Sequence, residues 1–129
     1  MESLVARLLM TPPKVLGPAR RLVPSPMPQT FTVARVGDLT EGRVKVVRAG
    51  TSPIALVLAG GVYRAFSNVC RHRGGPVGEG DVDPAEGTLT CPWHGWQYEL
   101  LTGKALLNPL ARLDVYKVEV VGDEIRVTL

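Results

Sequence analysis

From residue 31 onward, the chain alternates short apolar segments with glycine-containing turns, which is typical of a small all-β domain. The alternation is strictest near the C-terminus, where Tyr116, Val118 and Val120 are interleaved with Lys117 and Glu119. A period of two places one face of a strand in a core and the other in water. We therefore expect strands over residues 31–36, 43–48, 54–59, 62–68, 88–90, 96–100, 116–121 and 125–129.

Turns and one connector complete this pattern. Gly60-Gly61 joins the third and fourth strands as a tight hairpin, because adjacent glycines readily adopt the positive φ of a primed turn. Residues 122–124 turn the last hairpin. The segment 77–90 carries four carboxylates between residues 79 and 86, but it lacks the spacing of an EF-hand. We expect this segment to be a solvated connector between two functional loops.

The first thirty residues follow a different pattern. Residues 11–30 hold six of the chain's eleven prolines, which indicates an extended arm. In residues 1–10, Leu4, Val5, Leu8 and Leu9 fall on one helical face, so either a short docking helix or a frayed terminus fits. We expect residues 1–30 to be a flexible, proline-rich, basic arm, and residues 31–129 to form one domain.

Composition and charge narrow the class of protein. A chain of 129 residues with 45% hydrophobic residues suits one domain with a core, and 5% aromatics makes that core aliphatic. Residues 1–30 contain four basic and one acidic residue, whereas 31–129 balance eleven against eleven, so the net charge of +3 belongs to the arm. The chain has no basic stripe with interleaved aromatic residues, so we do not expect it to bind nucleic acid. No apolar run is long enough to span a membrane, and no apolar segment follows Arg20-Arg21 as an export signal would require, so we expect a cytoplasmic protein.

The chemistry of the chain is concentrated in two loops, which hold both cysteines and both histidines. They read Cys70-x-His72 and Cys91-x-x-His94. Thiolate and imidazole are the protein ligands best suited to iron, zinc and copper. Structural zinc sites usually pair cysteines within one loop, whereas each loop here carries one ligand of each type. This split favours a two-metal cluster in which one iron takes both sulfurs and the other both nitrogens. A zinc-stabilised interaction module remains the alternative.

Together with the flanking Gly74-Gly75-Pro76 and Pro92-Trp93-His94-Gly95-Trp96, these motifs closely resemble Rieske proteins, over about residues 31–129. The resemblance implies a small antiparallel β-sandwich or barrel with a cluster-binding subdomain at about residues 68–110. It also implies one [2Fe–2S] cluster per chain. The implied ligands are Cys70 and Cys91 on the inner iron, and His72 and His94 on the outer, solvent-facing iron.

Residues around the ligands indicate the subtype. Quinol-oxidising Rieske proteins add a disulfide and a serine at positions that correspond here to Gly75, Trp93 and Trp96. Tyr98 matches the family's hydrogen-bonding tyrosine. Because hydrogen bonds to the sulfurs raise the potential of the cluster, one hydroxyl and no disulfide predict a low potential. Gly74, Trp93, Trp96 and Pro109 are the other residues expected around the cluster, with Asn108-Pro109-Leu110 covering it. Trp93 and Trp96 fit loop packing, cluster shielding or a partner surface equally well.

The resemblance is strongest to the Rieske ferredoxins that serve bacterial oxygenases. It implies a one-electron carrier between a flavin-dependent reductase and a terminal oxygenase, with Arg71 and Arg73 as candidate docking residues. Once both histidines are assigned to the cluster, none remains for a catalytic iron site, so we expect an electron-transfer protein and no enzyme. A small subunit of a nitrite-reductase-like enzyme remains an alternative, while the missing disulfide and membrane anchor disfavour a quinol-type protein.

Overall fold

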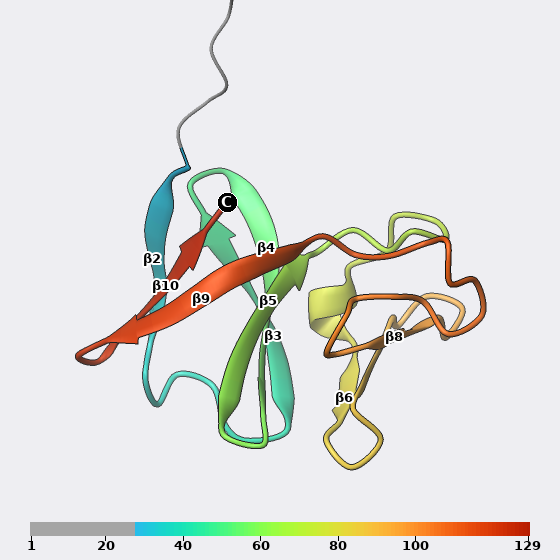
Figure 1. Cartoon of the computed structure of the whole chain (residues 1–129), viewed down its shortest axis with the longest axis horizontal. Coiled ribbons are helices and arrows are strands. Elements are labelled where there is room, and N and C mark those ends of the chain that lie inside the picture. Colours follow the sequence, from blue (N-terminus) through green and yellow to red (C-terminus); the bar gives the residue numbers. More distant parts are fainter. Residues whose placement is uncertain (1–27) are drawn as a thin grey trace, which may run out of the picture.

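The computed structural model describes residues 28–129, and six strands form its main sheet. Residues 1–10, for which a short helix and a frayed terminus are both open, and most of the expected arm lie outside the described residues. A division of the chain at residue 30 therefore stays a prediction. All neighbouring strands of the sheet are antiparallel, in the order β2-β10-β9-β5-β4-β3. The strands are β2 (Thr30–Arg35), β3 (Arg43–Ala49), β4 (Ser52–Ala59), β5 (Val62–Ser67), β9 (Val115–Val121) and β10 (Glu124–Thr128). The edge strands β2 and β3 contact each other, so the sheet curls almost into a barrel (Figure 1).

A smaller sheet is inserted between β5 and β9 and lies beside the main one (Figure 1). It contains β6 (Asp81–Asp83), β7 (Thr88–Thr90) and β8 (Gln97–Glu99) in antiparallel order, preceded by the 3-10 turn η2 (Val77–Glu79). The all-β fold with a separate subdomain is thus confirmed. None of the helical turns in the described part of the chain is long and apolar enough to cross a membrane.

The segment 77–90, expected to be a solvated connector, is solvated at its four carboxylates, but the prediction is wrong at its start and at β6. Val77 and Gly78 are buried, and β6 is hydrogen-bonded to β7. Asn68 anchors this segment, because its side-chain oxygen accepts a hydrogen bond from the backbone N–H of Gly78 at 2.7 Å. A Cβ atom at Gly78 would lie 2.6 Å from a methyl group of Val46 on β3. The turn η2 therefore packs tightly against the main sheet and holds the two sheets together.

Strand β4 is the wall that both sheets share. Its central residues form an unbroken apolar run, and side chains of adjacent residues point to opposite faces. Ile54 and Leu56 pack inside the near-barrel with Ile125, whereas Ala55 and Val57 pack toward the smaller sheet. Full burial of an aliphatic side chain contributes about 1.5–3 kcal/mol, so a strand buried on both faces fixes the subdomain firmly on its base.

The predicted hairpin turns are confirmed. Ala59 pairs with Val62, so the turn is the two residues Gly60 and Gly61, with φ angles of 62° and 76°. Positive φ at both positions is what a type I′ turn needs. The Glu41 carboxylate accepts hydrogen bonds from both glycine N–H groups, at 2.5 and 2.9 Å. The final hairpin also turns over two residues, Gly122 and Asp123, between Val121 and Glu124, but only Gly122 has a positive φ, of 64°.

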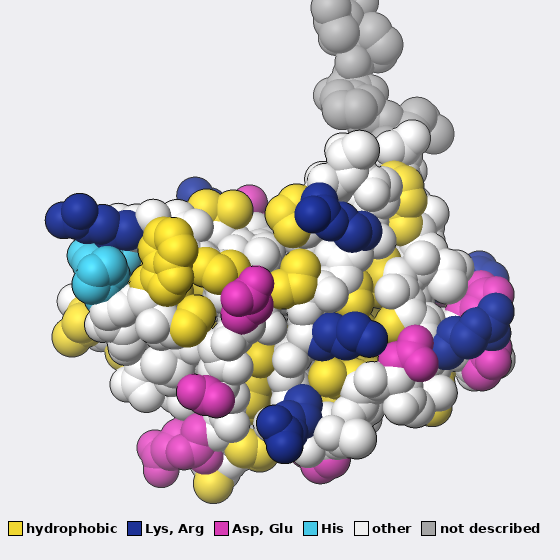
Figure 2. Space-filling view, turned by 180° about the vertical axis from the view of Figure 1, so that it is seen from behind, with side chains coloured by type: hydrophobic (Ala, Val, Ile, Leu, Met, Phe, Trp, Pro, Cys, Tyr) yellow, Lys and Arg dark blue, Asp and Glu magenta, His cyan; other side chains and the backbone are white. Residues whose placement is uncertain are grey.

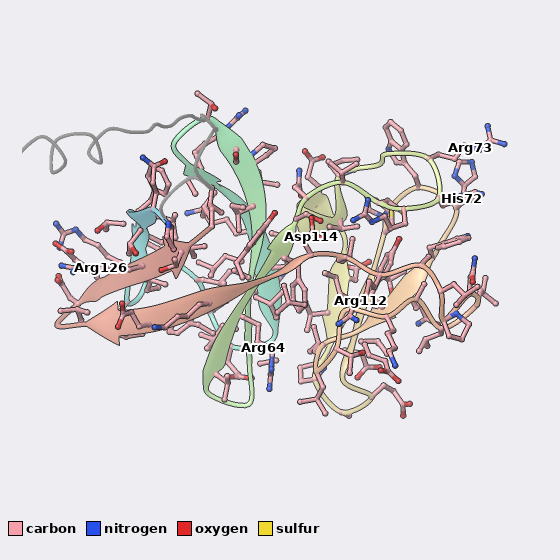
Figure 3. The ribbon with its side chains drawn as sticks, turned by 45° about the horizontal axis from the view of Figure 1, so that its top comes forward. Arg64, His72, Arg73, Arg112, Asp114 and Arg126 are labelled. Atoms are coloured by element: carbon pink, nitrogen blue, oxygen red, sulfur yellow. The ribbon has the colours of Figure 1, made fainter. Side chains whose placement is uncertain are left out.

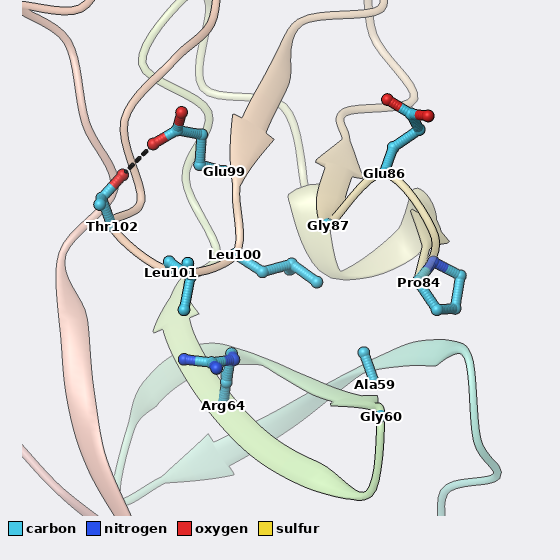
Figure 4. A pocket seen from close by; sticks show the side chains of 10 residues that line it. All are labelled: Ala59, Gly60, Arg64, Pro84, Glu86, Gly87, Glu99, Leu100, Leu101 and Thr102. Carbon is cyan, nitrogen blue, oxygen red and sulfur yellow. Dashed lines mark hydrogen bonds between the residues drawn. The ribbon is translucent and has the colours of Figure 1, made fainter.

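A cavity of about 330 Å³ lies where this β4–β5 hairpin faces the turns of the smaller sheet (Figure 4). Arg64 lies on one side of it and Glu86 and Glu99 on the other, and Glu99 accepts a hydrogen bond from the Thr102 hydroxyl at 2.6 Å (Figure 4). No cysteine or histidine lines this cavity. The chemistry predicted from the sequence therefore lies elsewhere.

Candidate metal centre

The two cysteine- and histidine-bearing loops are each closed by their own backbone hydrogen bonds. In the first loop, the N–H of Gly74 donates to the carbonyl of Cys70, and the N–H of Cys70 donates to the carbonyl of Gly75, both at 2.8 Å. In the second, the N–H of Cys91 donates to the carbonyl of Trp96 at 2.8 Å. Gly74 has a φ of 77°, which explains a glycine at this turn. Closure places each cysteine at the base of its loop.

The two thiols are buried next to each other. Cys70 and Cys91 are 3% and 1% exposed, and neither forms a disulfide. Burial raises the pKa of the Cys91 thiol, and the neighbouring Cys70 raises it further. Burial also acts to raise the pKa of Cys70, but the hydrogen bond with the Tyr98 hydroxyl and nearby backbone N–H groups outweigh it, so that this pKa is lowered.

The two imidazoles are exposed and adjacent. The ring centroids of His72 and His94 are 5.0 Å apart with the rings nearly perpendicular, at 88°. His94 has a φ of 65°, and within residues 28–129 it is the one non-glycine residue in the left-handed region. This conformation costs about 1–2 kcal/mol for an L-residue. Figure 2 shows histidine at the surface at one end of the molecule, beside a basic side chain and hydrophobic side chains.

The four candidate ligands thus form a buried pair of sulfurs and an exposed pair of nitrogens. In the described part of the chain, no three His, Cys, Asp or Glu side chains converge on a single point. Two such pairs would hold a two-iron centre, with two protein ligands for each iron. The residues present therefore fit a Rieske-type cluster.

Hydrogen-bond donors surround the sulfurs. The ring of Tyr98 is fully buried, and its hydroxyl lies 3.1 Å from the Sγ atom of Cys70. The same hydroxyl accepts a hydrogen bond from the backbone N–H of Arg71 at 2.9 Å, so its own proton is free to be donated to the sulfur. Burial and this contact with Cys70 raise the pKa of Tyr98, which keeps the hydroxyl protonated. The backbone N–H of Trp93 donates to the Sγ atom of Cys91 at 3.4 Å.

The two tryptophans of the second loop have different surroundings. Trp96 is half-buried and stacks on His72, with ring centroids 4.8 Å apart and an angle of 11° between the planes. Trp93 is 50% exposed and lies against Gly75, where a Cβ atom would be 2.8 Å from its indole and 3.0 Å from the Sγ atom of Cys91. Sequence reasoning did not foresee either contact, because both join residues from different loops.

The two arginines of the first loop also differ. The Nε atom of Arg71 donates to the carbonyl of Arg112 at 2.7 Å, and its Nη2 atom lies 3.5 Å from a carboxylate oxygen of Asp114. Arg71 is therefore held against the segment that leads into β9. Arg73 is exposed, and Figure 3 shows it extending from the end of the molecule beside His72.

The proline-bearing segment forms an ordinary turn. The N–H of Ala111 donates to the carbonyl of Asn108 at 2.9 Å, and the N–H of Leu110 donates to the Asn108 side-chain oxygen at 3.1 Å. Pro109 is exposed, and Leu110 is 95% exposed. This turn lies at the same end of the molecule as the two loops (Figure 1). A role in covering the cluster stays a prediction.

Comparison with known proteins gives the family. The family model described as "Rieske [2Fe-2S] domain" matches residues 29–119. The 3-phenylpropionate/cinnamic acid dioxygenase ferredoxin subunit of Escherichia coli (strain K12) is 38% identical over 96 residues, which are 73% of this chain and 88% of that protein. Mouse "Apoptosis-inducing factor 3" is 33% identical over 110 residues, which are 82% of this chain but 18% of that protein. The chain thus spans less than a fifth of this longer relative.

Solved structures agree with these relatives. The ferredoxin of carbazole 1,9a-dioxygenase from Nocardioides aromaticivorans IC177 superposes with a TM-score of 0.71 and 25% identity, covering 76% of this chain and 95% of that one. A chain from a complex of reduced oxygenase and oxidised ferredoxin in carbazole 1,9a-dioxygenase gives a TM-score of 0.67 and 29% identity, with 76% and 91% coverage. With its buried sulfur pair, exposed nitrogen pair and family match over residues 29–119, the chain belongs to the Rieske [2Fe-2S] domain family, whose members hold one such cluster per domain.

Proposed function

We propose that this chain is a one-electron carrier in which Cys70 and Cys91 bind one iron of the cluster and His72 and His94 bind the other. The observation that carries the proposal is the sorting of the ligands by burial, with the thiols at most 3% exposed and both imidazoles at the surface. When bound, the cluster supplies a one-electron redox couple. The exposed imidazoles give electrons a short path to a partner without any opening of the fold. Family membership displaces the zinc-stabilised module as an alternative.

The donors around the sulfurs support a potential at the low end of the Rieske range. Neutral imidazoles make the added electron easier to accept than thiolates would, and hydrogen bonds to sulfur stabilise the more negative reduced state. Among side-chain hydroxyls of the described residues, only that of Tyr98 contacts a cysteine sulfur. With a single such hydroxyl, we place the midpoint toward the lower limit of about −150 mV.

We further propose that the electron comes from a flavin-dependent reductase and goes to a terminal oxygenase. Support comes from the dioxygenase ferredoxin subunit that is 38% identical to this chain, and from the oxygenase–ferredoxin complex among its structural relatives. In this role the chain is a component of an oxidoreductase system and transforms no substrate itself. Because the ligand set uses both cysteines of the chain, we propose that it works in the reducing environment of the cytoplasm.

A potentiometric titration followed by electron paramagnetic resonance tests the ligand set and the potential together. Protein purified without chelators should contain two irons per chain. Its reduced form should show mixed sulfur and nitrogen ligation, with a midpoint potential of about −150 mV. Zinc in place of iron would refute the carrier. A midpoint several hundred millivolts higher would leave the cluster in place but refute the proposed partners. Size-exclusion of native extract would show co-elution with a larger enzyme if the chain were a permanent subunit.

The matched pair Arg71→Met and Arg73→Met tests which arginine docks a partner. Arg73 is exposed beside His72, so its loss should slow NADH-dependent reduction by a flavin-dependent reductase at low salt, and the difference should vanish at high salt. Arg71 is held by Arg112 and Asp114, so its loss should lower the free energy of unfolding by about 1–2 kcal/mol. Equal reduction rates for wild-type and Arg73→Met protein at low salt would exclude Arg73 as a docking residue.

A further inference from the structure

One aromatic contact joins the two loops at the outer edge of the centre. Trp96 comes from the second loop, just before β8, and His72 comes from the first. Their rings are almost parallel, 11° apart in orientation, with centroids separated by 4.8 Å. A flat ring that covers another flat ring at this distance excludes water from the covered face. One face of an otherwise exposed ligand candidate is therefore shielded by the indole.

The remaining freedom of the His72 ring is limited by its second neighbour. His94 approaches edge-on, at 5.0 Å and 88°. Rotation of the His72 ring about its own bonds would break the parallel contact with Trp96 and drive the ring toward His94. Trp96 is itself held, because it is half-buried, its carbonyl accepts the loop-closing hydrogen bond from Cys91, and its ring lies 6.4 Å from that of Tyr98. Trp96 is therefore held by contacts of its own, which do not depend on its contact with His72.

We propose that Trp96 is a positioning residue for His72: the indole sets the plane of the imidazole before metal is bound and keeps water from one of its faces. This inference rests on the ligand set proposed above. Groups behind a metal ligand commonly fix its orientation and tune the centre. Water at the imidazole would stabilise the more negative reduced state, so its exclusion lowers the midpoint potential. Trp96 thus adds to the low potential that the scarcity of hydroxyl donors predicts.

The test compares three variants of the iron-loaded full chain. Trp96→Phe keeps a flat ring over His72, whereas Trp96→Leu keeps apolar volume but no flat ring. Trp93→Leu removes an indole from the same loop, at a position that stacks on no histidine within residues 28–129. For each protein, pulsed electron paramagnetic resonance of the reduced form measures the nitrogen hyperfine couplings, and a redox titration gives the midpoint.

Trp96→Leu should broaden and shift the couplings of one nitrogen, raise the midpoint and speed the loss of iron to a chelator several-fold. Trp96→Phe should stay close to wild type, and Trp93→Leu should leave the nitrogen couplings unchanged. Wild-type couplings and midpoint in Trp96→Leu would overturn the inference, as would an equal change in Trp93→Leu. If Trp96→Leu does not fold, Trp96→Met takes its place, because it also lacks a flat ring over His72, and wild-type couplings and midpoint in that variant would overturn the inference in the same way. An absence of nitrogen couplings in wild-type protein would instead refute the proposed ligands, so the two failures are distinct.

Discussion

The hydroxyl of Tyr98 makes two hydrogen bonds with different consequences, and the substitution Tyr98→Phe removes both. The hydroxyl accepts from the backbone N–H of Arg71 at 2.9 Å and lies 3.1 Å from the Sγ atom of Cys70. The ring is fully buried, and phenylalanine keeps the whole ring in place. No cavity larger than one oxygen atom is created, so the effects of the variant come from the lost hydrogen bonds.

The magnitudes follow from what each partner loses. The N–H of Arg71 is left without an acceptor at a partly buried site, which costs about 1–3 kcal/mol of stability. A hydrogen bond to a charged acceptor contributes about 1.5–3 kcal/mol, against about 0.5–1.5 kcal/mol for a neutral one. The bond to sulfur therefore favours the reduced state, which has more negative charge, by about 1–1.5 kcal/mol. For a one-electron couple about 1.4 kcal/mol corresponds to about 59 mV, so the midpoint should fall by about 40–65 mV.

Redox titration and denaturant unfolding of the loaded protein measure the two effects separately. Tyr63→Phe is the matched control, because Tyr63 packs against the near-barrel core, away from both cysteines. It should leave the midpoint unchanged. An unchanged midpoint in Tyr98→Phe would refute the donation to Cys70, even if stability fell. A lower midpoint with unchanged stability would mean that water replaces the hydroxyl as the acceptor for Arg71.

Three glycine substitutions test how tightly the first cluster loop and the smaller sheet are packed. A methyl group at Gly75 would lie 2.8 Å from the indole of Trp93, so Gly75→Ala should lower the free energy of unfolding by about 1–3 kcal/mol. Most of this loss should disappear when Trp93 is also changed to alanine. If the losses in the double variant are additive instead, this clash is not the cause. A methyl group at Gly80 would lie 1.8 Å from the carbonyl oxygen of Thr90, so Gly80→Ala should cost about 3 kcal/mol or more. Gly87 has a φ of 70° and open space where a Cβ atom would lie, so Gly87→Ala should lower the free energy of unfolding by only about 1–2 kcal/mol. Thermal unfolding should therefore show Gly80→Ala to be less stable than Gly87→Ala. The opposite order would contradict the packing of the smaller sheet.

The elements that sequence predicts well are those set by local rules. The Gly60-Gly61 turn needs only its two residues to define a hairpin, and a two-residue turn sets the pairing of the strands on either side of it. The error at the connector has an equally physical cause. Strand β6 is three residues long, so its pattern of exposed Asp81, half-buried Val82 and exposed Asp83 completes a single alternation. A single apolar residue between two carboxylates looks the same in a strand and in a solvated segment, and only the pairing with β7 distinguishes the two.

The chemistry of the candidate centre is predictable because ligand identity is local, whereas its geometry is not. Each loop carries one cysteine and one histidine, so the residue types of Cys70, His72, Cys91 and His94 are enough to predict a sulfur pair and a nitrogen pair. The left-handed conformation of His94 and the stacking of Trp96 on His72 depend on how one closed loop meets another across 24 positions of sequence. No periodic signal encodes such a contact. If these contacts tune the centre as proposed, two chains with identical ligand motifs can differ in potential, and the difference lies in side chains such as Trp96 that the ligand motif does not fix.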